Sequence, residues 1–280
     1  VETDSATESD AITERTPLAT PIGDWILRVP ASISPSPARL DLLFQVDTTG
    51  SMHDEIAALQ ATITEVARKI TLQKELSLRW GLVLYADRDD PYLVRCYPFT
   101  EDVEVFRKRV LGIEKTSGGD EPEAALEALH TSLSDMNWDD GEAIRLIFHI
   151  ADAPPHLDYG RPYTYPDEIR QAVACGIKIY PIAASGLNKT GEYIYRQWAQ
   201  ATMARFLFIT YGAGTPAAGP AGKTPHEVAQ PEQRMNLDDV IVEAVLRELK
   251  HWTQPELYRA ENDPAESPRA VVPNIVDDQF

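Results

Sequence analysis

The sequence has few cysteines, few basic residues and no long apolar run. Its two cysteines, Cys96 and Cys175, are too few for a disulfide framework, and we expect two free, mostly buried thiols on separate strands. Lysine and arginine number 26 against 44 acidic residues, and the resulting charge of -18 argues against binding to nucleic acid or an anionic membrane surface. No apolar stretch is long enough to span a bilayer, so we expect no membrane insertion.

What is present indicates a globular protein. A chain of 280 residues with 43% hydrophobic side chains can bury a full core. The chain begins at Val1, without an initiator Met or a signal sequence. We therefore expect a processed protein or a piece of a longer one, and the sequence predicts no compartment.

Three segments differ in composition from the rest. Residues 1–36 are rich in Ser, Thr, Asp, Glu and Pro, which indicates an extended linker, although residues 24–29 are apolar enough to dock as a short strand. Residues 211–235 are dominated by Gly, Ala, Pro and Thr and predict a flexible loop excursion. Residues 253–280 predict an acidic, proline-containing tail, which leaves 37–252 as the folded domain.

Within the folded domain, strand-like and helix-like patterns alternate. Residues 40–46 form a continuous apolar run, as in a central strand buried on both faces, and the next segment has the three- and four-residue apolar spacing of a helix. Strands at 78–85 and 92–99, joined by a short turn, predict an antiparallel hairpin. Further helices are expected at 103–113, 124–133, 169–174, 194–203 and 237–249, and strands at 144–150, 177–183 and 205–210.

These patterns predict an α/β fold. We expect a doubly wound, mostly parallel six-stranded sheet with helices on both faces and one antiparallel edge strand. In such sheets, ligands bind beyond the carboxyl ends of the strands, where the strand order reverses. The first strand, at 40–46, is the expected place of that reversal.

The most informative feature follows this first strand. Asp47, Thr49 and Ser51 are oxygen-bearing side chains two residues apart, and a helical pattern begins directly after them. One carboxylate and two hydroxyls can form half of the oxygen cage of a hard divalent cation. We expect Mg²⁺ there, with Mn²⁺ or Ca²⁺ as alternatives.

Two later loops offer the remaining ligands. Asp152 follows the strand at 144–150 in the run His-Ile-Ala-Asp-Ala-Pro-Pro, and Asp120 lies in the run Gly-Gly-Asp-Glu-Pro-Glu between two helices. Thr116 is a second candidate in that loop. The predicted metal ligands are Asp47, Thr49, Ser51, Asp120 and Asp152.

These residues resemble the metal-ion-dependent adhesion site of the von Willebrand factor A domain. That site uses an Asp-x-Ser-x-Ser run, a Thr from a second loop and an Asp from a third. Here Thr49 stands for the first Ser, and Asp120 lies where the family usually has Thr, so we expect Asp120 to act as a ligand or through a water. The run Gly-Gly-Asp-x-Pro-Glu resembles a bacterial-type branch of the family. The order of elements from about residue 40 to residue 250 also fits the family.

The resemblance implies a binding module and not an enzyme. Its cation would bind a carboxylate of a protein partner, in adhesion or complex assembly, and Arg88, His156 and Tyr159 would contact that partner from the rim. Asp87, Asp89 and Asp90 are expected to form a solvated acidic rim, and His149 to be a core histidine with satisfied hydrogen bonds.

Two other functions stay open. A metal-dependent phosphohydrolase usually needs an acid two residues after its nucleophilic Asp, where this chain has Thr49, and Lys115 is the single lysine in the site loops. The other is a structural module with a vestigial metal site. Locally, Ser51 could simply cap the following helix together with Asp54, and Asp152 could be an ordinary loop carboxylate.

Overall fold

The computed structural model describes residues 38–72, 76–116, 121–184, 186–208 and 237–253. The predicted linker with its short strand, the loop excursion at 211–235 and Asp120 lie outside these residues. So does the predicted tail, apart from its first residue.

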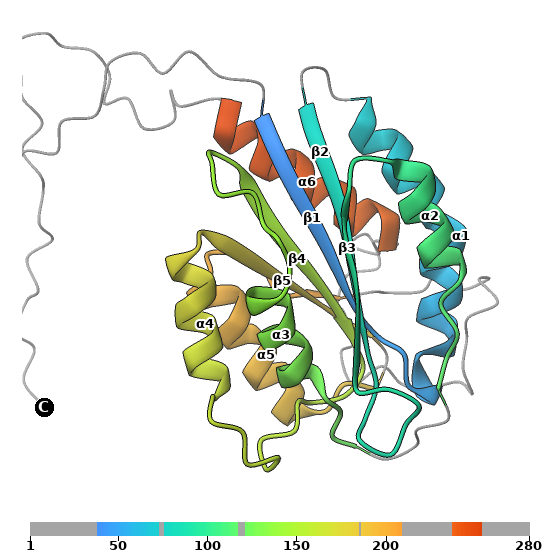
Figure 1. Ribbon diagram of the computed structural model, residues 1–280, viewed down its shortest axis with the longest axis vertical. Helices are drawn as coiled ribbons and strands as arrows, with labels where there is room; N and C mark the ends of the chain where they lie inside the picture. Colours follow the sequence, from blue (N-terminus) through green and yellow to red (C-terminus); the bar gives the residue numbers. More distant parts are fainter. Residues whose placement is uncertain (1–37, 73–75, 117–120, 185, 209–236, 254–280) are drawn as a thin grey trace, which may run out of the picture. The chain divides into compact units, whose positions relative to one another are not determined.

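A six-stranded sheet forms the centre of the described structure (Figure 1). Its strands are β1 (Ala38–Asp47), β2 (Leu76–Tyr85), β3 (Val94–Thr100), β4 (Ile144–Ala151), β5 (Ile177–Ala183) and β6 (Leu207–Phe208). They lie in the order β3-β2-β1-β4-β5-β6, and every neighbouring pair is parallel except the edge pair of β2 and β3. The strand order reverses between β1 and β4. The predicted sheet, its antiparallel edge strand and the position of the reversal are confirmed.

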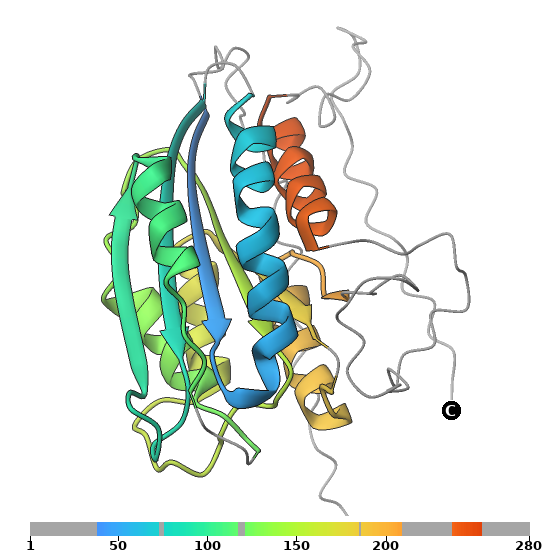
Figure 2. The same cartoon turned by 90° about the vertical axis from the view of Figure 1, so that its right-hand side faces the viewer.

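Helices cover both faces of this sheet (Figures 1 and 2). The helices are α1 (His53–Thr71), α2 (Val103–Leu111), α3 (Ala125–Ser134), α4 (Tyr165–Ala174), α5 (Lys189–Ala201) and α6 (Leu237–Thr253). One hydrophobic cluster joins the sheet to α1, α2 and α6, and a second joins the opposite face to α3, α4 and α5. A short 3-10 turn, Gly50–Met52, connects β1 to α1.

The centre of β1 is buried on both faces, which explains its mainly apolar sequence. Phe44 packs under α2 against Phe106, with ring centroids 5.3 Å apart, and against Phe148 of β4 at 5.6 Å. On the opposite face, the amide of Gln45 donates to the Ala125 carbonyl at 3.4 Å and accepts from the Ser132 hydroxyl at 3.2 Å. Both faces of β1 are therefore fixed against helices, and the loop that follows β1 has a rigid support.

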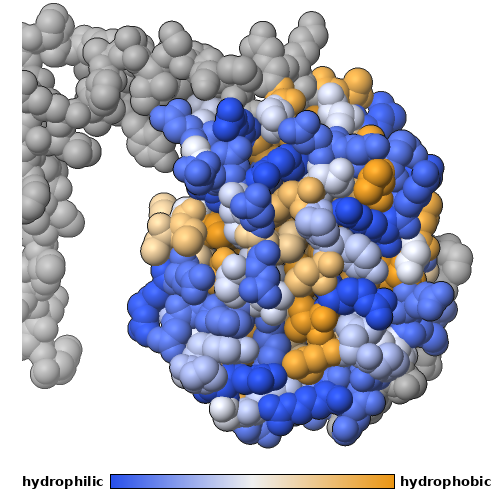
Figure 3. All heavy atoms as spheres, in the orientation of Figure 1, coloured by the Kyte–Doolittle hydropathy of each residue, from blue (hydrophilic) through white to orange (hydrophobic). Residues whose placement is uncertain are grey.

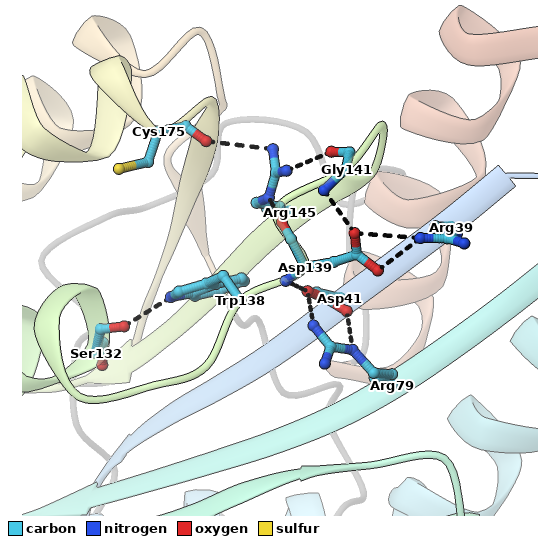
Figure 4. Close-up of polar contacts among 9 residues, drawn as sticks. All are labelled: Arg39, Asp41, Arg79, Ser132, Trp138, Asp139, Gly141, Arg145 and Cys175. Atoms are coloured by element: carbon cyan, nitrogen blue, oxygen red, sulfur yellow. Dashed lines mark hydrogen bonds and ion pairs between the residues drawn. The ribbon is translucent and has the colours of Figure 1, made fainter.

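A partly buried ion pair anchors the start of β1, at the end of the sheet opposite that loop (Figure 4). The Asp41 carboxylate is 1% exposed and accepts two bonds from the Arg79 guanidinium of β2, at 2.7 and 2.6 Å. The backbone N–H of Asp139 also donates to Asp41, at 2.8 Å. Arg145 in turn donates to the carbonyl oxygens of Asp139 and Gly141, at 2.7 and 2.6 Å. This network ties the loop before β4 to the two central strands.

Replacing Asp41 with Asn is expected to destabilise the fold by about 2 kcal/mol, because the buried carboxylate loses its charge-assisted hydrogen bonds with the partly exposed Arg79 guanidinium. Chemical denaturation measures this change. The control is Glu65→Gln, which removes the solvent-exposed pair with Arg68 and is expected to change stability little. Equal losses in the two variants would show that the Asp41 network has no special role in stability.

The surface of the described structure is mainly polar. Figure 3 shows one face that is largely hydrophilic, with a narrow apolar strip near its middle. Both cysteines are free, as predicted, but both are exposed, so the prediction of buried thiols is wrong. Cys96 lies on the edge strand β3, where no residue is fully buried, and Cys175 follows α4 and lies on no strand. In the described residues, no helix combines the length and apolarity needed to cross a bilayer.

Candidate metal centre

The loop after β1 folds around the Asp47 carboxylate. Asp47 is fully buried, and its Oδ1 accepts from the backbone N–H of Thr49 at 2.9 Å and from the Thr49 hydroxyl at 2.7 Å. The Thr49 and Ser51 hydroxyl oxygens are 3.3 Å apart. Asp47 Oδ2 has no hydrogen-bond partner among the described residues. The two-residue spacing of Asp47, Thr49 and Ser51 therefore brings one carboxylate and two hydroxyls together. One oxygen of that carboxylate has no hydrogen-bond partner among the described residues.

Asp152 meets this loop from the neighbouring strand. It follows β4, which pairs in parallel with β1, so the two loops leave the same edge of the sheet. The Asp152 carboxylate is hydrogen bonded to Ser51 and interacts electrostatically with Asp47. Its Oδ1 atom is buried and has no partner among the described residues. The structure thus brings Asp47, Thr49, Ser51 and Asp152 together.

The helix-capping alternative for Ser51 is wrong. Neither the 3-10 turn nor α1 begins with a side-chain cap in the described structure. Thr116 also lies beside the first loop, where its backbone N–H and hydroxyl donate to the Thr48 carbonyl at 2.7 and 3.3 Å. The Thr116 hydroxyl is therefore bound to the backbone.

When two carboxylates are close together and buried, each makes ionisation of the other less favourable, which raises the pKa. Burial, and secondly the charge of Asp152, raise the pKa of Asp47 from 3.8 to about 8, although the bonds from Thr49 act in the opposite direction. Burial also raises the pKa of Asp152, against the effect of its bond with Ser51. A cation between these oxygens would remove the repulsion.

The donor set fits a hard divalent cation. All four groups offer oxygen, which Mg²⁺, Mn²⁺ and Ca²⁺ prefer, and two of the carboxylate oxygens lack partners among the described residues. In the described ranges, no three or more His, Cys, Asp and Glu side chains are arranged to hold a metal ion. Such a centre would therefore depend on the hydroxyls of Thr49 and Ser51 as well as on its two carboxylates.

Comparison with known proteins agrees with the fold. A family model described as the von Willebrand factor A domain matches residues 41–160, from β1 to the loop after β4. The match supports a von Willebrand factor A domain in this chain. The bacterial-type branch stays a prediction.

Two curated relatives are similar to part of this chain. Alpha-protein kinase vwkA of Dictyostelium discoideum is 32% identical over 120 residues, which are 42% of this chain and 19% of that protein. Putative ariadne-like RING finger protein R811 of Acanthamoeba polyphaga mimivirus is 25% identical over 119 residues, which are 42% of this chain and 11% of that protein. The aligned region therefore spans less than a fifth of either relative.

The predicted rim residues form a compact cluster. The Arg88 guanidinium lies 3.4 Å from the centroid of the Tyr159 ring and donates to the Tyr159 carbonyl at 2.9 Å. The His156 ring stacks on Tyr159 at 4.0 Å, and the Tyr159 hydroxyl donates to Asp87. We call Asp87, Arg88, His156 and Tyr159 the rim clasp, because they join the loops after β2 and β4. Since the Asp87 side chain is only 13% exposed and is bonded, the prediction that it is solvated is wrong.

A cavity of about 350 Å³ adjoins the rim clasp. Tyr159, Tyr163 and Tyr165 line it, together with Leu157, which is 58% exposed. The Tyr163 ring also stacks on His130 of α3, with centroids 3.8 Å apart. Tyr163 thus packs against a neighbouring helix and still lines the cavity.

His149 lies in the core, as predicted. Its ring is fully buried against Tyr85, Tyr195 and Trp198. Neither ring nitrogen has a partner among the described residues, so the expected hydrogen bonds are absent there. Burial lowers the pKa of His149 from 6.5 to about 3, which keeps the ring neutral.

Glu123 is an acidic residue of this edge that was not among the predicted site residues. Its side chain is 2% exposed, and burial, with the charge of Asp47 as the next cause, raises its pKa from 4.5 to about 9. Glu123 lies in an irregular loop, where the sequence has no periodic pattern of apolar residues that would predict burial. The sole signal in the sequence was its place in the same run as Asp120.

Proposed function

We propose that this A domain is a metal-dependent protein-binding module. A divalent cation, Mg²⁺ in the first place and Mn²⁺ or Ca²⁺ otherwise, would be held by Asp47, Thr49, Ser51 and Asp152, with Asp120 as a fifth ligand. A carboxylate of a protein partner would complete the coordination, in adhesion or in complex assembly.

One observation carries this proposal. Asp47 and Asp152 are buried side by side, and each keeps one carboxylate oxygen without a partner among the described residues. Burying like charges without compensation is unfavourable, so such an arrangement is expected where a cation binds. Because the Thr49 and Ser51 hydroxyls are neutral ligands, the cation keeps affinity for a further anionic oxygen.

The site residues favour binding over hydrolysis. A phosphohydrolase of this kind needs an acid at position 49 to transfer a proton. Thr49 stands there instead, and its hydroxyl donates to Asp47 at 2.7 Å. We therefore propose that the domain is not an enzyme.

The partner would contact the surface beside the cation. The rim clasp joins the loops that flank the proposed centre, and the tyrosine-lined cavity lies next to it. Tyrosine side chains offer a large apolar area and a hydroxyl, which suits them to protein interfaces. The clasp and the cavity are the surface that we expect to select the partner.

A carboxylate that binds the cation should displace a metal-bound water. The chain is loaded with Mn²⁺, and water-proton relaxation is followed while a glutamate-containing peptide is added. We expect the relaxation enhancement to fall with this peptide and to stay constant with the matched glutamine peptide. Asp47→Asn should show no enhancement at all.

Equal responses to the two peptides would contradict carboxylate capture, and an absence of Mn²⁺ binding would contradict the centre itself. Affinity capture with and without a chelator then identifies the natural partner, which should be released when the cation is removed.

A further inference from the structure

Glu123 crosses the end of β1. Its backbone N–H donates to the Pro154 carbonyl, in the loop after β4, at 3.0 Å. The next residue, Ala124, donates to the Ala86 carbonyl, in the loop after β2, at 3.1 Å. Because β1 lies between β2 and β4 in the sheet, a segment bonded to both loops must pass over the end of β1, where Asp47 lies.

The Glu123 side chain is buried there among other carboxylates. It is 2% exposed, and its Oε2 has no partner among the described residues. The charges that act on it most strongly are those of four acidic side chains, namely Asp47, Asp87, Asp90 and Asp152. Such a position destabilises the fold when the carboxylate is charged.

Glu127, one turn further along, provides a contrast. It is also buried, with 3% exposure, and one of its oxygens likewise lacks a partner among the described residues. Its other oxygen, however, accepts from the Arg161 guanidinium at 2.9 Å. Glu127 therefore has a counter-charge within the chain, whereas the principal neighbours of Glu123 are all acidic.

We infer that Glu123 is a positioning residue of the proposed metal centre, and that its carboxylate reaches the cation through a metal-bound water. This inference rests on the proposed function. We place a water between the carboxylate and the cation because the described residues offer no group of three His, Cys, Asp or Glu side chains as direct ligands. Mg²⁺ usually keeps several waters, and a carboxylate that accepts from such a water both orients it and strengthens cation binding.

The test compares Glu123→Gln with the matched variant Glu127→Gln. Calorimetric titration with MgCl₂ measures affinity, and denaturation in EDTA measures the stability of the metal-free protein. We expect Glu123→Gln to bind Mg²⁺ roughly 10- to 100-fold more weakly, as outer-shell changes do, and to be more stable without metal. Glu127→Gln should bind Mg²⁺ like the wild type and be less stable, because Arg161 loses its partner.

The outcomes separate this inference from the proposed function. If the wild type binds no Mg²⁺, the proposed function fails. If the wild type binds and Glu123→Gln binds equally well, the inference alone is overturned. A Glu123→Gln protein that is less stable than the wild type, or does not fold, would show a structural role and also overturn it.

Discussion

Replacing Asp47 with Asn is expected to abolish divalent-cation binding and to make the metal-free protein more stable. Asn keeps the oxygen that accepts from Thr49 and removes the charge that Asp152 repels. A rise in pKa from 3.8 to about 8 corresponds to an upper bound of about 6 kcal/mol. A variant that loses function while gaining stability would mark Asp47 as a residue kept for binding.

The stability that Asp47→Asn gains over the metal-free wild type should increase as pH rises. Because the pKa of Asp47 is raised on folding, the folded state holds more protons than the unfolded state between about pH 4 and pH 8. The stability of the metal-free wild type should therefore fall as pH rises through this window, relative to Asp47→Asn. Denaturation in EDTA at pH 5 and at pH 8.5 measures the difference between the two proteins.

Asp89→Asn is the control, since Asp89 is an exposed carboxylate in the loop after β2. It should follow the wild type at both pH values. An Asp47→Asn protein that is less stable than the wild type at pH 8.5 would contradict the account. Added Mg²⁺ should stabilise the wild type, by about 2.7 kcal/mol at one hundred times its dissociation constant, and leave Asp47→Asn unchanged.

The second large effect on the stability of the fold is expected at acid pH, where the buried His149 ring would have to be protonated. Because its pKa is lowered from 6.5 to about 3 on folding, the folded state binds fewer protons than the unfolded state within this window. Stability should fall as pH drops below 6.5, by about 1.4 kcal/mol per pH unit. His149→Leu removes the titrating group and the two unpartnered nitrogens, so it should be more stable than the wild type by about 3 kcal/mol at pH 4.5.

Denaturation at pH 4.5 and at pH 7.5 compares the two proteins. His53→Leu is the matched control, since His53 is exposed at the start of α1, and its acid profile should resemble that of the wild type. If the gap between His149→Leu and the wild type does not widen from pH 7.5 to pH 4.5, the ring is not held neutral in the core.

Much of the fold could be predicted because local patterns and layer packing agree. The apolar run at 40–46 indicated a strand buried on both faces, and β1 is buried in this way. The start of α4 was placed at residue 169, four residues late. Its true start was readable, since Thr164 and Asp167 form a capping box and Pro166 lies in the first turn.

The proximity of Asp47 and Asp152 was also predictable, because parallel strands end at the same edge of a sheet. The burial of Glu123 was not, since it arises from backbone bonds to two loops that are distant in sequence. The bond between Asp87 and Tyr159 joins residues 72 apart and left no local signal. Asp120 lies outside the described residues, and its role stays a prediction.

The central claim is that oxygens of Asp47, Thr49, Ser51 and Asp152 bind one divalent cation. The most direct measurement is calorimetric titration of the wild type, Asp47→Asn and Asp152→Asn with MgCl₂ in chelator-free buffer. The account predicts stoichiometric binding by the wild type and none by either variant. Absence of binding to the wild type at millimolar Mg²⁺, or undiminished binding by both variants, would contradict it.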